Sequence, residues 1–217
     1  MKSIIRKILK KLSFVFSRLP FVNRRRLRGA KLSLNGALLV HCKIDCKGKG
    51  NEITFAKGVM IKNTLILIRG NNNKVSVGEN SVIVNGELWI EDDNNLISIG
   101  KATKLCGKAH LACIEGTAIR IGDGCLFSSD LVFRTGDSHS VLDSEGKRIN
   151  PSADIVVGDK VWIGHRAMVT KGAKIPANSV VGTGAIVTKA FEEQGVALAG
   201  VPAKVIKTNI GWCSKRI

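Results

Sequence analysis

From Val157 onward, an aliphatic residue returns at every sixth position of the chain. The six positions are Val157, Ile163, Val169, Ile175, Val181 and Val187. Small or apolar residues fill the fifth position of most of these hexads, and glycine follows the aliphatic residue in three of the six. A period of six matches neither the 3.6 residues per turn of a helix nor the simple alternation of a single strand. It therefore predicts a stacked repeat in which each coil is closed by its neighbours.

A second repeat, of 22 residues, precedes the hexads. Aligning the segments 51–60, 73–82, 95–104 and 117–126 superposes apolar and polar positions alike: Phe55, Val77, Ile99 and Ile121; Ile53, Val75, Ile97 and Ile119; and Asn51, Asn73 and Asn95. A coil of 22 residues has roomier corners than a coil of 18, so one solenoid is expected to extend well upstream of the hexads. About six or seven coils, stacked ~4.8 Å apart, would make a prism roughly 30 Å tall.

The repeat is interrupted across residues 134–156, a polar and turn-rich segment. Val157 resumes the pattern 36 residues after Ile121, which is twice 18, so the register is kept across the interruption. This arrangement predicts a loop extruded from the coil, and such loops are where function concentrates.

The N-terminal segment holds most of the chain's surplus positive charge. The formal net charge is +17, and residues 1–44 contain twelve lysines and arginines but no acidic residue. Apolar residues at helical spacing across 2–19, ended by Pro20, predict a basic amphipathic helix that is too short and too charged to span a bilayer. Residues 1–28 suit contact with an anionic membrane, and packing on the body or on a neighbouring subunit is the alternative. Nucleic acid is not expected, because no aromatic stacking platform accompanies the charge.

The spacing of the cysteines and histidines indicates the redox state of the compartment and whether a metal site is expected. The six cysteines form no CxxC pair, and the N-terminus lacks a small-residue cleavage site. We therefore expect a reduced cytoplasmic chain, which the basic arm would hold at the inner face of the membrane if it binds lipid. The four histidines are scattered, so no metal site is predicted.

Several motifs together resemble one family. They are the hexads at 157–190, the loop sequence Asp137-Ser138-His139, the VWIG at 161–164 and the closing AGVPAKVI at 199–206. The chain resembles, over roughly residues 50–207, the hexapeptide-repeat acyltransferases, and in particular the sugar O-acetyltransferases of bacterial polysaccharide assembly. This resemblance implies an all-β, left-handed parallel β-helix, a homotrimer with active sites in the clefts between subunits, and acetyl-CoA as donor. The chain then divides into a basic arm (1–31), the β-helix (32–207) with its loop at 134–156, and a tail (208–217), with the stretch from Phe191 onward capping the end.

The resemblance assigns the role of catalytic base to His139. Transfer of an acetyl group from a thioester to a sugar hydroxyl requires that the hydroxyl proton be removed as the oxygen attacks, and histidine titrates close to neutral pH. Asp137 or Asp143 would orient the imidazole ring. His41 and His110 are interpreted as structural.

A donor groove also follows from the resemblance. The pantetheine arm of CoA would run beside residues of successive hexads, namely Gly164, His165, Gly182 and Thr183, and beside Thr188. The nucleotide phosphates would be bound by Lys204 and Lys207. Relatives often carry a small residue at the position of His165, so the contact of this histidine is a departure from the pattern. Trp162 is either a wall beside His139 or a cover for the seam between subunits.

The leading expectation is an acetyl-CoA-dependent O-acetyltransferase that acts on a sugar of a surface polysaccharide or of its precursor. An N-acetyltransferase of an amino sugar nucleotide or a small amine is the enzymatic alternative. A non-catalytic β-solenoid that serves as a scaffold is a third reading, against which the interrupting loop argues.

Overall fold

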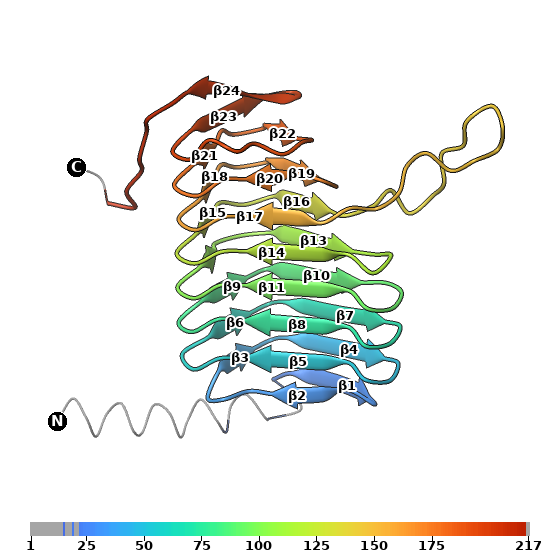
Figure 1. Ribbon diagram of the computed structural model, residues 1–217. Coiled ribbons are helices and arrows are strands. Elements are labelled where there is room, and N and C mark those ends of the chain that lie inside the picture. Colours follow the sequence, from blue (N-terminus) through green and yellow to red (C-terminus); the bar gives the residue numbers. More distant parts are fainter. Residues whose placement is uncertain (1–14, 16–18, 20–21, 216–217) are drawn as a thin grey trace.

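The chain winds into a three-sided β-solenoid (Figure 1). The structure, a computed structural model, describes Val15, Leu19 and residues 22–215. Each complete coil gives one strand to each of three parallel sheets, here called sheets A, B and C. The predicted parallel β-helix is thereby confirmed. The amphipathic helix predicted over residues 2–19 lies outside the described residues, apart from Val15 and Leu19.

Sheet A contains β1 (Arg24–Arg28), β4 (Lys43–Lys47), β7 (Leu65–Arg69), β10 (Gly86–Ile90), β13 (Ala109–Cys113), β16 (Leu131–Arg134), β19 (Met168–Thr170) and β22 (Ile186–Val187). Sheet B contains β2 (Lys31–Ser33), β5 (Glu52–Phe55), β8 (Lys74–Val77), β11 (Leu96–Ile99), β14 (Ala118–Ile121), β17 (Ile155–Val157) and β20 (Lys174–Ile175). Sheet C contains β3 (Leu38–Val40), β6 (Met60–Lys62), β9 (Val82–Val84), β12 (Lys104–Leu105), β15 (Leu126–Phe127), β18 (Trp162–Ile163), β21 (Val180–Val181), β23 (Ala197–Gly200) and β24 (Ala203–Lys207). Of the strands in the described residues, only β24 runs antiparallel to its neighbour, and it ends sheet C at the C-terminal side of the prism.

The predicted repeats correspond to the strand register of sheet B. The pairs that the 22-residue repeat superposes are neighbours on adjacent coils: Ile53 with Val75, Val75 with Ile97, Ile97 with Ile119, and likewise Phe55 with Val77, Val77 with Ile99 and Ile99 with Ile121. In the hexad region the step between coils falls to 18 residues, as between Val157 and Ile175. Because side chains alternate between the two faces of a strand, this register stacks the aliphatic residues in continuous buried columns.

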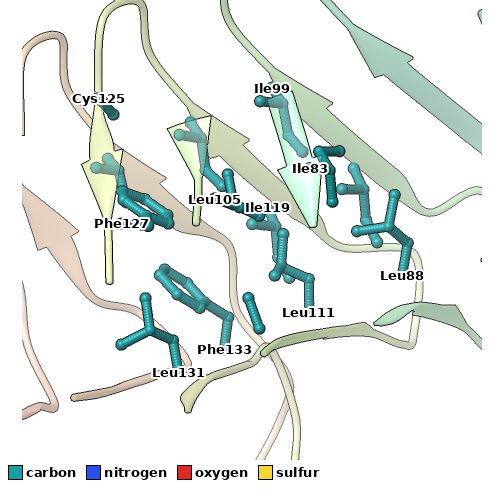
Figure 2. Close-up of a cluster of buried hydrophobic side chains, with 14 of the residues drawn as sticks. Ile83, Leu88, Ile99, Leu105, Leu111, Ile119, Cys125, Phe127, Leu131 and Phe133 are labelled. Atoms are coloured by element: carbon teal, nitrogen blue, oxygen red, sulfur yellow. The ribbon is translucent and has the colours of Figure 1, made fainter. Parts of the chain in front are cut away.

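The core is a narrow column of branched aliphatic side chains that all three sheets contribute (Figure 2). The rings of Phe127 and Phe133 are stacked, with centroids 5.5 Å apart and planes at 9°. Both side chains are fully buried. The small residues at the fifth position of the hexads are buried as well, so each coil can close tightly around the core.

A ladder of buried polar side chains lines one corner of the 22-residue coils. The Asn51 Oδ1 atom accepts a hydrogen bond from the Asn73 backbone N–H (2.9 Å), and Asn73 Oδ1 accepts one from the Asn95 N–H (2.8 Å). Asn95 Oδ1 in turn accepts from the Thr117 N–H (3.0 Å). These side chains satisfy backbone groups that a corner would otherwise bury unpaired, which explains why asparagine recurs with the same period as the aliphatic residues.

The first coil begins at Arg24, within residues 1–31, which were predicted to form a basic arm. The strand β1 pairs with β4 in the register Arg25–Ile44 and Leu27–Cys46. Alternate residues of a strand face opposite sides, so Arg24, Arg26 and Arg28 are exposed while the residues between them are half-buried. The cluster of arginines is thus a strand of the first coil, and the boundary between arm and solenoid lies before residue 32. Within the described residues, no helix has the length and apolar character needed to cross a membrane.

Candidate active site

The polar loop leaves the prism between β16 and β17 and projects far to one side (Figure 1, yellow). It occupies residues 135–154, slightly fewer than the 134–156 expected. Ile121 pairs directly with Val157, and Phe127 pairs directly with Ile163. The spacing of 36 residues therefore comprises one coil plus the loop, and the register is kept because the loop begins and ends at the same corner.

Asn150 organises the base of this loop. Its side chain is 8% exposed, and its Nδ2 group donates to the Asp137 carboxylate and to the His139 carbonyl oxygen, both at 2.8 Å. Its Oδ1 atom accepts from the Val141 backbone N–H at 2.7 Å. One buried amide thus joins the outgoing and returning limbs of the loop and holds the backbone of His139. The imidazole of His139 lies on an exposed position.

The two carboxylates that were expected to orient His139 have other partners. Lys171 Nζ and Asn150 Nδ2 both donate to Asp137 Oδ2, and these hydrogen bonds, that of Lys171 first, lower the pKa of the Asp137 carboxyl. Asp143 accepts from the backbone N–H groups of Glu145 and Lys147 and so shapes the turn at the loop tip. Among the described residues, neither carboxylate is hydrogen-bonded to the His139 ring.

The returning limb is anchored by an ion pair that the sequence analysis missed. Both terminal nitrogens of Arg148 contact the Glu115 carboxylate, at 2.8 and 3.0 Å, and Ser152 Oγ donates to it at 2.8 Å. The hydrogen bonds from Arg148 and then Ser152 lower the pKa of the Glu115 carboxyl. Glu115 lies at the same corner of the preceding coil, so the loop is held from below by Glu115 and from above by Lys171.

Four residues of the expected donor groove lie together at the corner between sheets C and A. Gly164 and His165 follow β18, and Gly182 and Thr183 follow β21. A Cβ atom on Gly164 would lie 2.7 Å from the backbone nitrogen of Thr183, so only glycine allows the two coils to approach this closely. The backbones of the two coils therefore lie close together at this corner.

His165 is held by the coil below it. Its Nδ1 atom lies 2.9 Å from Ser129 Oγ, 3.0 Å from the Ser129 carbonyl oxygen and 3.6 Å from Asp130 Oδ2. Ser129 is 36 residues before His165, the same offset that relates Ile121 to Val157. Applying that offset to the sequence would have identified this contact.

The other expected residues of the groove lie elsewhere on the chain. Thr188 follows β22 and is at the corner between sheets A and B, on the side from which the loop projects. Lys204 and Lys207 are exposed on β24. One chain therefore does not bring Thr188 to the corner of Gly164 and Gly182.

Trp162 is 41% exposed on the outer face of sheet C. The ring of Trp212, from the C-terminal tail, lies 6.3 Å from it at 42°, and Trp212 Nε1 donates to the Lys160 carbonyl oxygen at 2.6 Å. The sequence alone gave Trp212 no role, because no repeat relates the tail to β18. No group of three or more potential metal ligands occurs among the described residues.

No family model matches the chain. Among solved structures, the polySia-specific acetyltransferase NeuO is similar with a TM-score of 0.73 and 30% identity, over 86% of this chain and 77% of that one. The polysialic acid O-acetyltransferase OatWY is similar with a TM-score of 0.60 and 31% identity, over 80% of this chain and 92% of that one.

Curated relatives match over a shorter part. A polysialic acid O-acetyltransferase of Escherichia coli O1:K1 is 36% identical over 43% of this chain and 31% of its own length. A galactoside O-acetyltransferase of Escherichia coli strain K12 is 36% identical over 45% of this chain and 48% of its own length. The chain thus matches less than half of the length of these relatives, 31% in one and 48% in the other.

Proposed function

Since the chain belongs to the hexapeptide-repeat acetyltransferases of left-handed β-helix fold, we propose that it transfers an acetyl group from acetyl-CoA to a sugar hydroxyl of a bacterial surface polysaccharide or its precursor. The observation that carries this proposal is its likeness, over most of its length, to two structures whose names specify acetylation of polysialic acid. A galactoside O-acetyltransferase among the relatives points to a sugar hydroxyl as well.

His139 is the general base of the proposed reaction. Its imidazole removes the proton of the acceptor hydroxyl while the oxygen attacks the thioester carbonyl. The C–S bond then breaks, and the thiolate of CoA takes up the proton from His139. The hydrogen bond from Asn150 to the His139 carbonyl supports this role, because it holds the backbone that carries the ring. No covalent intermediate on the protein is needed if both substrates bind together.

The donor would lie along the corner of Gly164 and Gly182, with Lys204 and Lys207 as charges for the nucleotide phosphates. His139 is on the loop at the corner between sheets A and B, whereas Gly164 and Gly182 are at the corner between sheets C and A. This separation supports a proposal in which two copies of the chain form each site, in a homotrimer with its sites between subunits.

Exposed apolar side chains at the loop also support assembly. Val141, Leu142 and Ile149 are 51%, 55% and 56% exposed. Aliphatic side chains so exposed on one loop suit burial against a neighbouring copy. The loop would then bring His139 to the donor groove of that neighbour.

The location we propose is the cytoplasmic side of the membrane, where residues 1–28 would hold the enzyme against anionic lipid. The exposed arginines of β1 continue this positive charge onto the first coil. Sedimentation with anionic liposomes, with and without residues 1–23, tests the contact. Equal sedimentation of the two proteins would argue against a contact through residues 1–23.

The test of the proposed function is thiol release from acetyl-CoA in the presence of separate acceptors: sialic acid oligomers, neutral oligosaccharides, amino sugars and small amines. We expect release with a hydroxyl acceptor and a base-labile O-acetyl product. Release with amines alone would indicate an N-acetyltransferase, and no release with any acceptor would contradict the proposal.

A further inference from the structure

A slot opens on the outer face of sheet A, next to the base of the loop. Trp89 of β10, Ala112 of β13 and Arg134 of β16 occupy one cross-strand row, in which each residue pairs with the next. The small Ala112 lies between two large side chains whose strands are roughly 9.5 Å apart. The result is a cavity of about 240 Å³ whose lining includes all three residues together with His110 and Ser138.

Polar contacts hold the Trp89 indole at one side of this slot. Trp89 Nε1 donates to Glu91 Oε1 at 2.8 Å, and the ring lies 6.3 Å from that of His110. His110 Nδ1 is in turn 3.0 Å from Glu87 Oε2. His110, which the sequence analysis interprets as structural, is half-buried on this face of sheet A. Both carboxylates are engaged, and the indole has a defined orientation before any ligand binds.

Arg134 forms the opposite side of the slot. Its guanidinium donates to Ser138 Oγ at 3.3 Å and has no ion pair among the described residues. A planar guanidinium binds a carboxylate through two parallel hydrogen bonds. Ser138 immediately precedes His139, so a ligand in the slot lies beside the segment that carries the proposed base.

We propose that this slot binds an acidic sugar residue of the acceptor, with the ring against Trp89 and the carboxylate on Arg134. The inference rests on the proposed function, and it adds the class of acceptor: a sialic or uronic acid rather than a neutral sugar. Sites for small ligands combine an apolar wall with a few oriented polar groups, and this slot has both. Binding here would hold the acceptor for attack without taking part in proton transfer.

The test compares the wild type with Arg134→Gln and Trp89→Ala, using a sialic acid oligomer and its carboxyl-reduced, neutral form as acceptors. Lys74→Gln is the matched control, because it removes one positive charge from an exposed position on sheet B. Loss of a charge-assisted hydrogen bond is expected to raise the KM for the acidic oligomer at least about tenfold in Arg134→Gln. The kcat and the KM for acetyl-CoA should be unchanged, as for a contact made equally in ground and transition states.

Further comparisons separate this inference from the proposed function. Trp89→Ala should raise the KM for both acceptors, whereas Arg134→Gln should leave the KM for the neutral form unchanged. Titration calorimetry with the acidic oligomer measures binding even if no acetyl transfer occurs. An active enzyme whose KM for the acidic oligomer does not change in either variant would overturn the proposal that the slot binds the acceptor. So would calorimetry in which Arg134→Gln binds the oligomer as the wild type does, or in which the wild type does not bind it.

Discussion

At the scale of single residues, the buried side-chain amide of Asn150 holds the backbone of the loop that carries His139. Asn150 contacts Asp137, His139 and Val141, so its side chain joins the two limbs of the loop at its base. A carboxamide is suited to this place because it donates and accepts at once. His139 therefore has an ordered backbone although its side chain is exposed.

Removing this amide should slow catalysis. In Asn150→Ala we expect a fall in kcat of about 10- to 100-fold, since displacement of a catalytic group by about 1 Å costs that much. The KM for acetyl-CoA should not change, because the proposed donor groove is at another corner. Steady-state kinetics measure both, with Ser144→Ala at the exposed loop tip as the control. Wild-type kcat in Asn150→Ala would mean that the amide does not position His139.

At the scale of elements, coils and loop depend on different forces. The coils rely on stacked apolar columns, and in the hexads the buried Ala173 takes the corner position before sheet B that asparagine holds in the longer coils. The loop relies on charged contacts between corners, chiefly Glu115 with Arg148 and Asp137 with Lys171. The coils should therefore be sensitive to substitutions in the core, and the loop to pH and to the loss of charged side chains.

The stability of the coils should depend on the stacked aromatic pair. Phe133→Ala is expected to lower the free energy of unfolding by about 3–5 kcal/mol, because a cavity replaces a fully buried ring. Val132→Ala, on the same strand but half-buried on its outer face, should cost clearly less. Denaturant unfolding of both variants checks this, and equal losses would contradict the arrangement of the core.

The attachment of the loop should depend on pH. The pKa values of Glu115 and Asp137 are lowered in the folded state, so their stabilisation is complete above the ordinary carboxyl range of about 4 and is lost as the pH falls through the lowered values. Hydrogen exchange of the amides in 141–150 should accelerate in acid before that of the strands. In Glu115→Gln the loop should exchange faster already at neutral pH and depend less on pH. Loop protection that does not change with pH would contradict this.

At the scale of the whole molecule, the two halves of the proposed site lie at different corners of one prism. If neighbouring subunits supply them, two inactive variants should complement each other. His139→Ala lacks the base, and Thr183→Trp places a bulky ring at an exposed position of the groove. Unfolding and refolding the two together should restore activity that neither shows alone. Inactive mixtures that nevertheless form mixed trimers would contradict a site between subunits.

The sequence predicted the columns of the solenoid better than its corners. Ile53, Val75 and Ile97 could be paired because each buried column must repeat with the coil. The ion pair of Glu115 and Arg148 could not be predicted, because the two residues are 33 apart and no repeat relates the loop to the corner that holds Glu115. The strand of β1 could not be predicted from the repeat, because Arg24 pairs with Lys43 and this step differs from the 22 residues of the following coils.

The central claim is that His139 is the base for acetyl transfer to a sugar hydroxyl. Its most direct test is the rate of O-acetylation of a sialic acid oligomer by the wild type and by His139→Ala, with matched folding and oligomeric state. Loss of general-base catalysis should lower kcat by about 10²- to 10⁴-fold and leave acetyl-CoA binding intact. Ser140→Ala, one residue further along the loop, should retain the wild-type rate. A His139→Ala protein that acetylates the oligomer at the wild-type rate would contradict the claim.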